Sequence, residues 1–98
     1  MAKTFKPTKQ MQINARRALA MRKKASPSAR GGTPVGLARA NQFAKGEAVS
    51  LETVKRTFSF LSRAKTYYKP GTNTPGTQAY GLWGGPAGLS WARRILKK

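Results

Sequence analysis

The side chains of this chain that could do chemistry are almost all cationic. Its 98 residues hold 20 lysines and arginines against Glu47 and Glu52, with no histidine and no cysteine, and the formal charge is +18. These absences exclude thiol catalysis, disulfides, the common zinc sites and the usual general base. The two glutamates, five residues apart, make a poor acid-base or metal pair. We therefore expect a protein that is not an enzyme and that needs no metal, cofactor or small-molecule substrate.

A chain this basic is expected to bind a polyanion. Each lysine or arginine that neutralises a phosphate releases a condensed counterion, which favours nucleic acid whatever its sequence. An anionic membrane surface is the weaker candidate. No apolar run approaches the roughly 18 residues that a membrane span needs, and the N-terminus lacks the apolar segment of a secretory signal. We expect a cytosolic protein, or one packaged in a particle assembled in the cytosol.

The segment SARGGTP has the chemistry of a phosphate contact. Glycines let a phosphate approach the backbone, a helix start supplies free N–H groups, and Arg30 adds charge. Gly31, Gly32 and Thr33 are the candidate phosphate-contact loop. The Walker spacing is missing, so nucleotide hydrolysis is not expected. We favour a plain helix-start signal, with Thr33 as cap and Pro34 in the first helical position, and keep the phosphate contact as the alternative.

A second set of residues interleaves guanidinium groups with aromatic rings. Its members, at spacings of four, three and four, share one face of a helix: Arg56, Phe60, Arg63 and Tyr67. The arginines would contact phosphates or bases while the rings stack on bases. Equally, Phe60 and Tyr67 would form a second core patch if this helix is buried on two sides.

The elements that must position these residues are helices. Capping residues and helix formers predict helices over residues 8–25, 34–45, 51–68 and 75–83, and a terminal helix from residue 86. Gly46 fits the left-handed position after the second helix. No alternating strand pattern is present. We therefore predict an all-α fold of four to five short helices in one domain, residues 8–98, after a flexible basic arm, residues 1–7.

The first predicted helix is amphipathic. At about 100° per residue, Met11, Ala15, Ala18 and Leu19 share one face. The opposite face carries Lys9, Arg16, Arg17, Lys23 and Lys24, with no acidic residue at the next turn to relieve their repulsion. The alternative is a face that is merely solvated. A further basic cluster ends the chain: Arg93, Arg94, Lys97 and Lys98.

Two further interpretations concern the third helix and the aromatic residues. AKGEAVSLETVKR resembles a helix-turn-helix, in which Thr53, Lys55 and Arg56 would face DNA, although the connection is longer than the usual turn. The expected core stripe of this helix is Leu51, Val54, Phe58 and Leu61. The cluster Tyr67, Tyr68, Tyr80, Trp83 and Trp91 would stack on bases or, as we favour for the tryptophans, close the core.

Two motifs carry a family resemblance. RGGTPVGLARANQFAKGEAVSLETVKRTFSFLSRA and the later AYGLWGGPAGLSWAR resemble a small module of tailed-bacteriophage and prophage proteins, with the pattern RGGTxVGxARA and then WxLWGGDxGxxWA. The positions that fit are Arg30, Gly31, Gly32, Thr33, Val35, Gly36, Ala38, Arg39, Gly46, Ser50, Thr53, Val54, Arg56, Phe60, Arg63, Leu82, Trp83, Gly84, Gly85, Gly88, Trp91 and Ala92. Pro86 replaces the usual acidic residue, and AKTYYKPGT replaces a stretch rich in histidine. The resemblance implies a phage origin, in the host cytoplasm or the virion, and supplies no mechanism.

These observations favour a non-catalytic phage-type protein that binds nucleic acid, DNA rather than RNA, mainly through phosphates. Its predicted contacts are the basic residues of the first helix, the phosphate-contact loop, Lys55, the Arg56 to Tyr67 face and the terminal cluster. One alternative is a virion component, such as a capsid-lining, cement or head-associated protein that meets packaged DNA or an acidic capsid surface. The others are a small RNA-associated protein and an inhibitor that docks on an acidic host protein. The sequence does not specify an oligomeric state.

Overall fold

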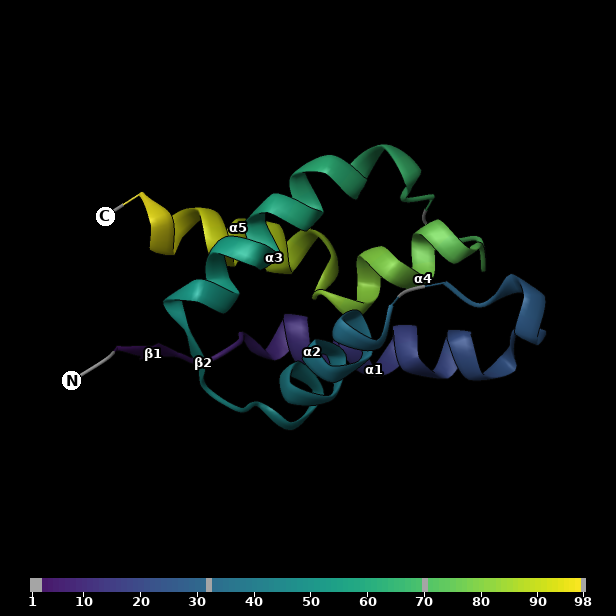
Figure 1. The fold of residues 1–98 in the computed structure, drawn as a ribbon, viewed down its shortest axis with the longest axis horizontal. Helices are drawn as coiled ribbons and strands as arrows, with labels where there is room; N and C mark the ends of the chain where they lie inside the picture. The colour runs from purple at the N-terminus through teal and green to yellow at the C-terminus, as the bar shows by residue number, and fades with distance from the viewer. Residues whose placement is uncertain (1–2, 32, 70, 98) are drawn as a thin grey trace.

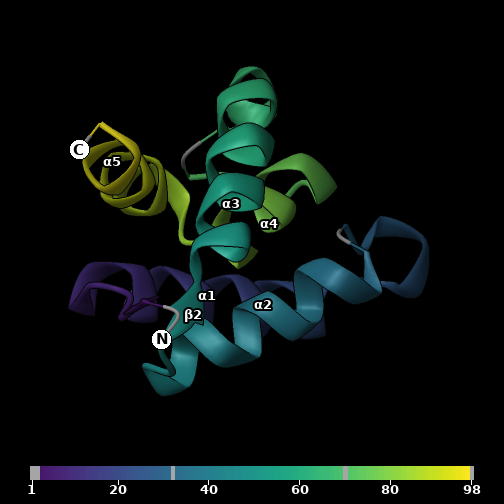
Figure 2. The same ribbon diagram turned by 60° about the vertical axis from the view of Figure 1, so that its left-hand side comes forward.

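The computed structural model describes residues 3–31, 33–69 and 71–97. In chain order its elements are β1 (Thr4–Phe5), α1 (Lys9–Lys24), a 3-10 turn η1 (Pro27–Ala29), α2 (Pro34–Lys45), β2 (Val49–Ser50), α3 (Leu51–Ala64), a 3-10 turn η2 (Lys65–Tyr67), α4 (Pro75–Leu82) and α5 (Gly85–Leu96). Helices α1 and α2 lie side by side in one layer, and α3, α4 and α5 form the layer above them (Figures 1 and 2). The predicted all-α fold is confirmed.

Hydroxyl side chains start four of the five described helices. Each accepts a hydrogen bond from the N–H group three residues later, which has no partner inside the helix; the four residues are Thr8, Thr33, Ser50 and Thr74. Gly46 follows α2 with a φ of 74°, in the left-handed region that favours glycine. The predicted starts of the first four helices are thus confirmed.

The core lies between the two layers. On α1 it includes Met11, Ala15 and Ala18, as the amphipathic pattern predicted. The upper layer contributes larger side chains, among them Val54, Leu61, Leu82, Trp83 and Trp91, and α2 contributes Phe43. Trp91 packs edge-on against Phe43 with ring centroids 5.9 Å apart. The core role that we favoured for the two tryptophans is confirmed.

Two details of the third helix differ from prediction. Leu51, expected in the core stripe, is 41% exposed, because it opens α3 beside a groove that lies between it, Phe5 of β1 and the end of α5. The α-helix also stops at Ala64 instead of continuing to residue 68. The next three residues form the tighter turn η2, so Tyr67 does not continue the helical stripe of α3.

The predicted flexible arm needs correction for the described residues 3–7. Thr4 and Phe5 pair antiparallel with Ser50 and Val49, so two short strands exist where the sequence indicated none. The indole N–H of Trp91 donates to the carbonyl oxygen of Lys6 at 2.8 Å. These contacts use backbone groups and partners more than 40 residues away in the chain, which no local pattern reveals. Residues 1 and 2 lie outside the described residues.

Candidate nucleic-acid surface

The exposed side of α1 carries five cations that face solvent. They are Lys9, Arg16, Arg17, Lys23 and Lys24, which we call the α1 basic face. Met11, Ala15 and Ala18, on the opposite side of the helix, are buried. In the part of the chain that the structure describes, the one ion pair joins Arg56 and Glu52 on α3, at 3.9 Å. The α1 basic face therefore keeps its charge unpaired, as the sequence predicted for this helix.

Arg16 is the one member of this face with an anchored side chain. Its Nη2 donates to the carbonyl oxygen of Ala44 at 2.9 Å, in the last turn of α2, where carbonyl groups lack partners within the helix. A carbonyl oxygen carries no net charge, so the guanidinium stays cationic and its other N–H groups stay free. Arg16 remains exposed and can meet an anion while it ties α1 to α2.

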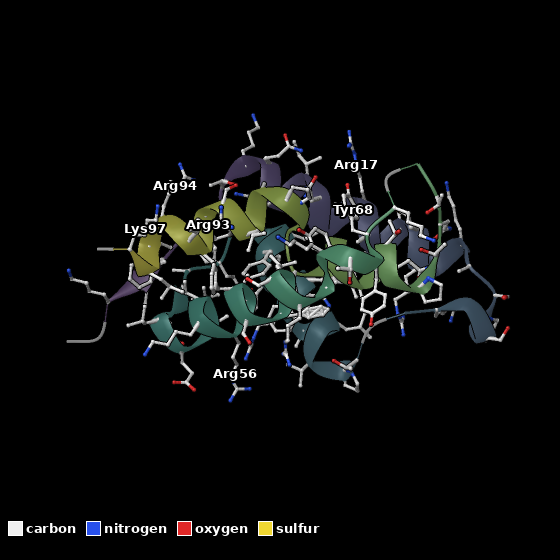
Figure 3. All side chains as sticks on the ribbon, turned by 90° about the horizontal axis from the view of Figure 1, so that it is seen from above. Arg17, Arg56, Tyr68, Arg93, Arg94 and Lys97 are labelled. Carbon is white, nitrogen blue, oxygen red and sulfur yellow. The ribbon has the colours of Figure 1, made fainter. Side chains whose placement is uncertain are left out.

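Arg17 lies beside a hollow of about 510 Å³ between α1 and the segment that leads into α4. Asn14, Thr72 and Asn73 line the hollow with amide and hydroxyl groups. Seen from above, Arg17 points to the same side of the molecule as the basic residues at the end of α5, which are Arg93, Arg94 and Lys97 (Figure 3). Arg17 of α1 and the basic end of α5 thus lie on one side. Lys98 lies outside the described residues.

Gly31 of the candidate phosphate-contact loop is used for internal packing instead. Gly31 is buried, and its N–H donates to Oε1 of Gln78 at 2.8 Å. Its carbonyl oxygen accepts from Nε of Arg22 at 3.0 Å. A Cβ atom at this position would overlap the backbone of Pro75, the first residue of α4. Because its N–H is buried and already bonded, Gly31 cannot hold a phosphate, and that prediction is wrong for this residue.

Thr33, the other described residue of this loop, supports the helix-start interpretation. The hydroxyl oxygen of Thr33 accepts from the N–H of Gly36 at 3.1 Å, and Pro34 takes the first position of α2. This hydroxyl is therefore committed to α2, and the helix-start interpretation that we favoured is confirmed at Thr33. Gly32 lies outside the described residues.

Arg30 also serves the fold. Its Nε donates to the carbonyl oxygens of Arg22 and Ala25, at 3.1 and 3.2 Å, and its Nη2 lies 3.4 Å from the carbonyl oxygen of Lys23. These carbonyls belong to the end of α1, where the helix dipole favours a cation. Arg30 is thus a C-terminal cap of α1, and because its side chain is exposed and its partners are uncharged, the phosphate contact stays a prediction.

The predicted stripe on α3 is divided by the structure. Phe60 is half-buried and stacks on Trp83, with ring centroids 5.3 Å apart and an interplanar angle of 20°. Tyr67 is 67% exposed, and with Arg63 it lines a hollow of about 360 Å³. Arg56 points to the side of the molecule opposite Arg17 (Figure 3). Phe60 therefore belongs to a core patch, as the alternative interpretation predicted, whereas Tyr67 is an exposed ring beside Arg63.

The helix-turn-helix interpretation is not supported. Thr53, expected to face DNA, is 7% exposed, while Lys55 and Arg56 are exposed. Helix α2 packs mainly against α1 and α4, whereas α3 packs mainly against α5. The two helices therefore do not pair as a helix-turn-helix requires, and the start of α3 cannot enter a groove of DNA through Thr53.

The other aromatic residues are mostly enclosed. Tyr68 stacks on Tyr80 with ring centroids 4.6 Å apart. Burial raises the pKa of the Tyr80 hydroxyl, and the charge that Tyr68 would carry when ionised raises it further. Trp83 and Trp91 are 7% and 5% exposed. Of the five rings in the predicted cluster, only Tyr67 offers a largely open face for stacking.

Gln78 has a role that no sequence pattern above predicted. This residue is fully buried on α4, where its Oε1 accepts from Gly31 and its Nε2 donates to Oδ1 of Asn73 at 2.8 Å. It thus joins the segments before α2 and before α4. The available signal was a glutamine between core residues of a short predicted helix. A buried amide of this kind must find partners, because leaving it unbonded is costly.

Within residues 3–31, 33–69 and 71–97, no helix is long and apolar enough to cross a membrane. The same residues contain no cluster of three or more histidine, cysteine, aspartate or glutamate side chains able to hold a metal ion. The fold and surface thus define a small all-helical domain with a one-sidedly basic helix. The chain matches no protein-family model, no curated protein and no solved structure.

Proposed function

We propose that this protein is a non-catalytic nucleic-acid-binding protein whose main contacts are phosphates held by the α1 basic face. The observation that carries the proposal is the row of five exposed cations on one helix, none of them paired with a carboxylate. A cation without a carboxylate partner is free to neutralise a phosphate and so to release a counterion condensed on the nucleic acid, so this face gains more from a polyanion than a surface already neutralised by acids.

The geometry suits the backbone of a duplex better than its base edges. The 16 residues of α1 make a helix about 24 Å long at 1.5 Å per residue. Its cations are distributed along that length, and the basic end of α5 lies on the side to which Arg17 points (Figure 3). Long cationic side chains that reach phosphates fix position without reading sequence. We therefore expect weak sequence preference and strong salt dependence.

The preference for DNA and the phage origin are also part of the proposal. Both rest on the two motifs that resemble tailed-phage and prophage proteins, RGGTPVGLARA and LWGGPAGLSWA. A protein of this kind would act in the host cytoplasm or in the virion. Most of the residues described in these motifs, including Gly31, Thr33 and Trp83, serve packing or capping, so we place the binding surface elsewhere, on α1.

The test is a salt titration of binding to a duplex of 20 base pairs, measured by fluorescence anisotropy. In the variant Arg17→Gln with Lys24→Gln, two phosphate contacts are lost. The slope of log Kd against log salt should fall by about 1.8, since each contact contributes about 0.9. The matched control is Lys45→Gln with Lys65→Gln, which removes the same charge from exposed sites on α2 and η2.

Three outcomes would contradict the proposal. A flat salt dependence of the unaltered protein would reject a phosphate-dominated mode. An equal loss of slope in the control variant would show that net charge acts without a defined surface. Tighter binding to duplex RNA of the same length would reject the preference for DNA.

A further inference from the structure

A groove of about 900 Å³ lies at the end of the molecule where β1, the start of α3 and the end of α5 meet. Figure 1 shows these three segments together, at the end away from α4. The groove contains no residue of the α1 basic face. It shares Arg94 and Lys97 with the basic end of α5 but contains none of the five cations that carry the proposed function, so the two surfaces can be tested separately.

The floor of this groove is apolar. It is formed by Phe5, Leu51, Trp91, Ile95 and Leu96. Leu51 is 41% exposed, which makes it one of the few large apolar side chains left open to solvent among the described residues. Ile95 and Leu96 are only partly covered by the core. Aliphatic side chains held open in this way gain free energy when a partner removes them from water.

The rim of the groove is uniformly cationic. Lys3, Lys55, Arg94 and Lys97 line it, and all four are exposed. No carboxylate lines the groove. Glu52, on the first turn of α3, instead approaches Arg56, which projects from the side of the molecule opposite the basic end of α5 (Figure 3). An occupant would therefore meet an apolar floor between positive edges.

We propose that this groove docks an acidic amphipathic helix of a protein partner, with apolar side chains on Leu51, Ile95 and Leu96 and carboxylates toward the four cations. A groove bounded by two helices receives a third helix through side chains spaced three and four residues apart. Opposite charge at the rim orients such a helix and speeds its association.

Two other occupants fit less well. A nucleic acid would satisfy the rim but leave the aliphatic floor uncovered, and the ring of Trp91 is not free to stack, because it is 5% exposed and its N–H bonds the Lys6 carbonyl. A second copy of this chain brings only two carboxylates against 20 lysines and arginines, so it cannot neutralise the rim. A helix of an acidic protein satisfies both the floor and the rim.

The test uses synthetic 18-residue peptides and the full chain at physiological salt. One peptide places leucines on a single helical face and glutamates elsewhere, and a second has the same composition in scrambled order. We expect the first to bind with a Kd in the micromolar range and at least about tenfold more tightly than the second, since only segregated leucines reach the floor together. In NMR spectra the indole N–H signal of Trp91 should shift, while that of Trp83, which does not line the groove, should not.

Substitutions locate the binding. Leu51→Gln should weaken the segregated peptide about fivefold, because a partly open leucine is lost from the interface. Val35→Gln is the matched control, since Val35 is 48% exposed on α2, away from the groove, and should leave binding unchanged. Lys55→Gln should weaken binding about twofold, as expected for an exposed charge pair, and Lys45→Gln should not.

The proposal is overturned if both peptides bind equally, which would indicate charge alone, or if Val35→Gln weakens binding as much as Leu51→Gln. It is also overturned if duplex DNA shifts the Trp91 signal and loses affinity on Leu51→Gln while the peptides do not bind. In that case the groove would belong to the nucleic-acid surface.

Discussion

The α1 basic face and the segment from Arg30 to Thr33 carry the same chemistry in the sequence and differ in the folded protein. Both combine positive charge with hydrogen-bond donors that suit phosphate. On α1 the cations face solvent without acidic partners. In the loop, Arg30 bonds carbonyls at the end of α1, and Gly31 donates its N–H to Gln78. A donor is available to a ligand only when the fold has not already used it.

The physical reason for the difference is backbone satisfaction. A helix bonds its own backbone, so the side chains on its outer face are free. The loop before α2 lies partly inside the protein, and its backbone groups must be bonded by other parts of the chain. Arg22 and Gln78 meet that requirement, because Arg22 donates to the carbonyl oxygen of Gly31 and Gln78 accepts from its N–H group. The groove between α3 and α5 adds a third case, in which cations stay free beside an apolar floor.

The largest effect should come from Gly31→Ala, which tests the close packing of the segment before α2. A Cβ atom at this position overlaps the backbone of Pro75, and backbone cannot move aside as a flexible side chain can. We expect a loss of about 3 kcal/mol in the free energy of unfolding, measured with urea. The control is Gly71→Ala, where the added atom meets nothing within 4 Å and only the φ of 84° resists, so the loss should be about 1 kcal/mol. Equal losses would show that Gly31 is not held by close packing.

The next effect tests the bonds that occupy the loop. Gln78→Leu leaves the buried N–H of Gly31 without its acceptor and Asn73 without its donor, at similar side-chain volume. We expect a loss of about 2 kcal/mol in the free energy of unfolding. Gln10→Leu, an exposed site on α1, should change it by less than about 0.5 kcal/mol. A neutral Gln78→Leu would mean that the loop backbone finds other partners.

The smallest effect concerns Arg30 and Arg17, which carry the same charge but which we expect to serve stability and DNA binding, respectively. Arg30→Gln should lower the free energy of unfolding by about 1 kcal/mol, because carbonyls at the end of α1 lose their donor, and the salt slope of DNA binding should not change. Arg17→Gln should leave stability unchanged and reduce that slope by about 0.9. Urea unfolding of both variants checks the expected stabilities, and the salt titration of both checks the expected slopes. If Arg30→Gln also reduces the slope, the distinction between the two surfaces is wrong.

Particular residues show how much of the structure could be predicted from the sequence. Thr8, Thr33, Ser50 and Thr74 start helices where local patterns placed them, because a capping hydroxyl acts on an N–H three residues away. Leu51 could not be assigned in the same way. Its stripe position predicts burial, and its exposure depends on the groove that β1 and the end of α5 leave beside the start of α3.

The two proposed binding surfaces also differ in whether the sequence could predict them. The α1 basic face follows from helical periodicity in one segment, so it was predicted with all five of its cations. The groove joins Phe5 and Lys3 to the start of α3 and the end of α5, which are far apart in the chain. The pairing of β1 with β2 and the bond from Trp91 to Lys6 bring these segments together, and neither contact has a local signature.

The sequence by itself determined the helices, their starts, the charge of the molecule and the outward row of cations on α1. These depend on interactions within one or two helical turns, which are encoded where they act. Only the tertiary structure decided which donors remain free, which rings are enclosed and where apolar and basic residues from distant segments meet. Those outcomes depend on which segments pack together, because burial and bonding at one residue are set by neighbours remote in the chain.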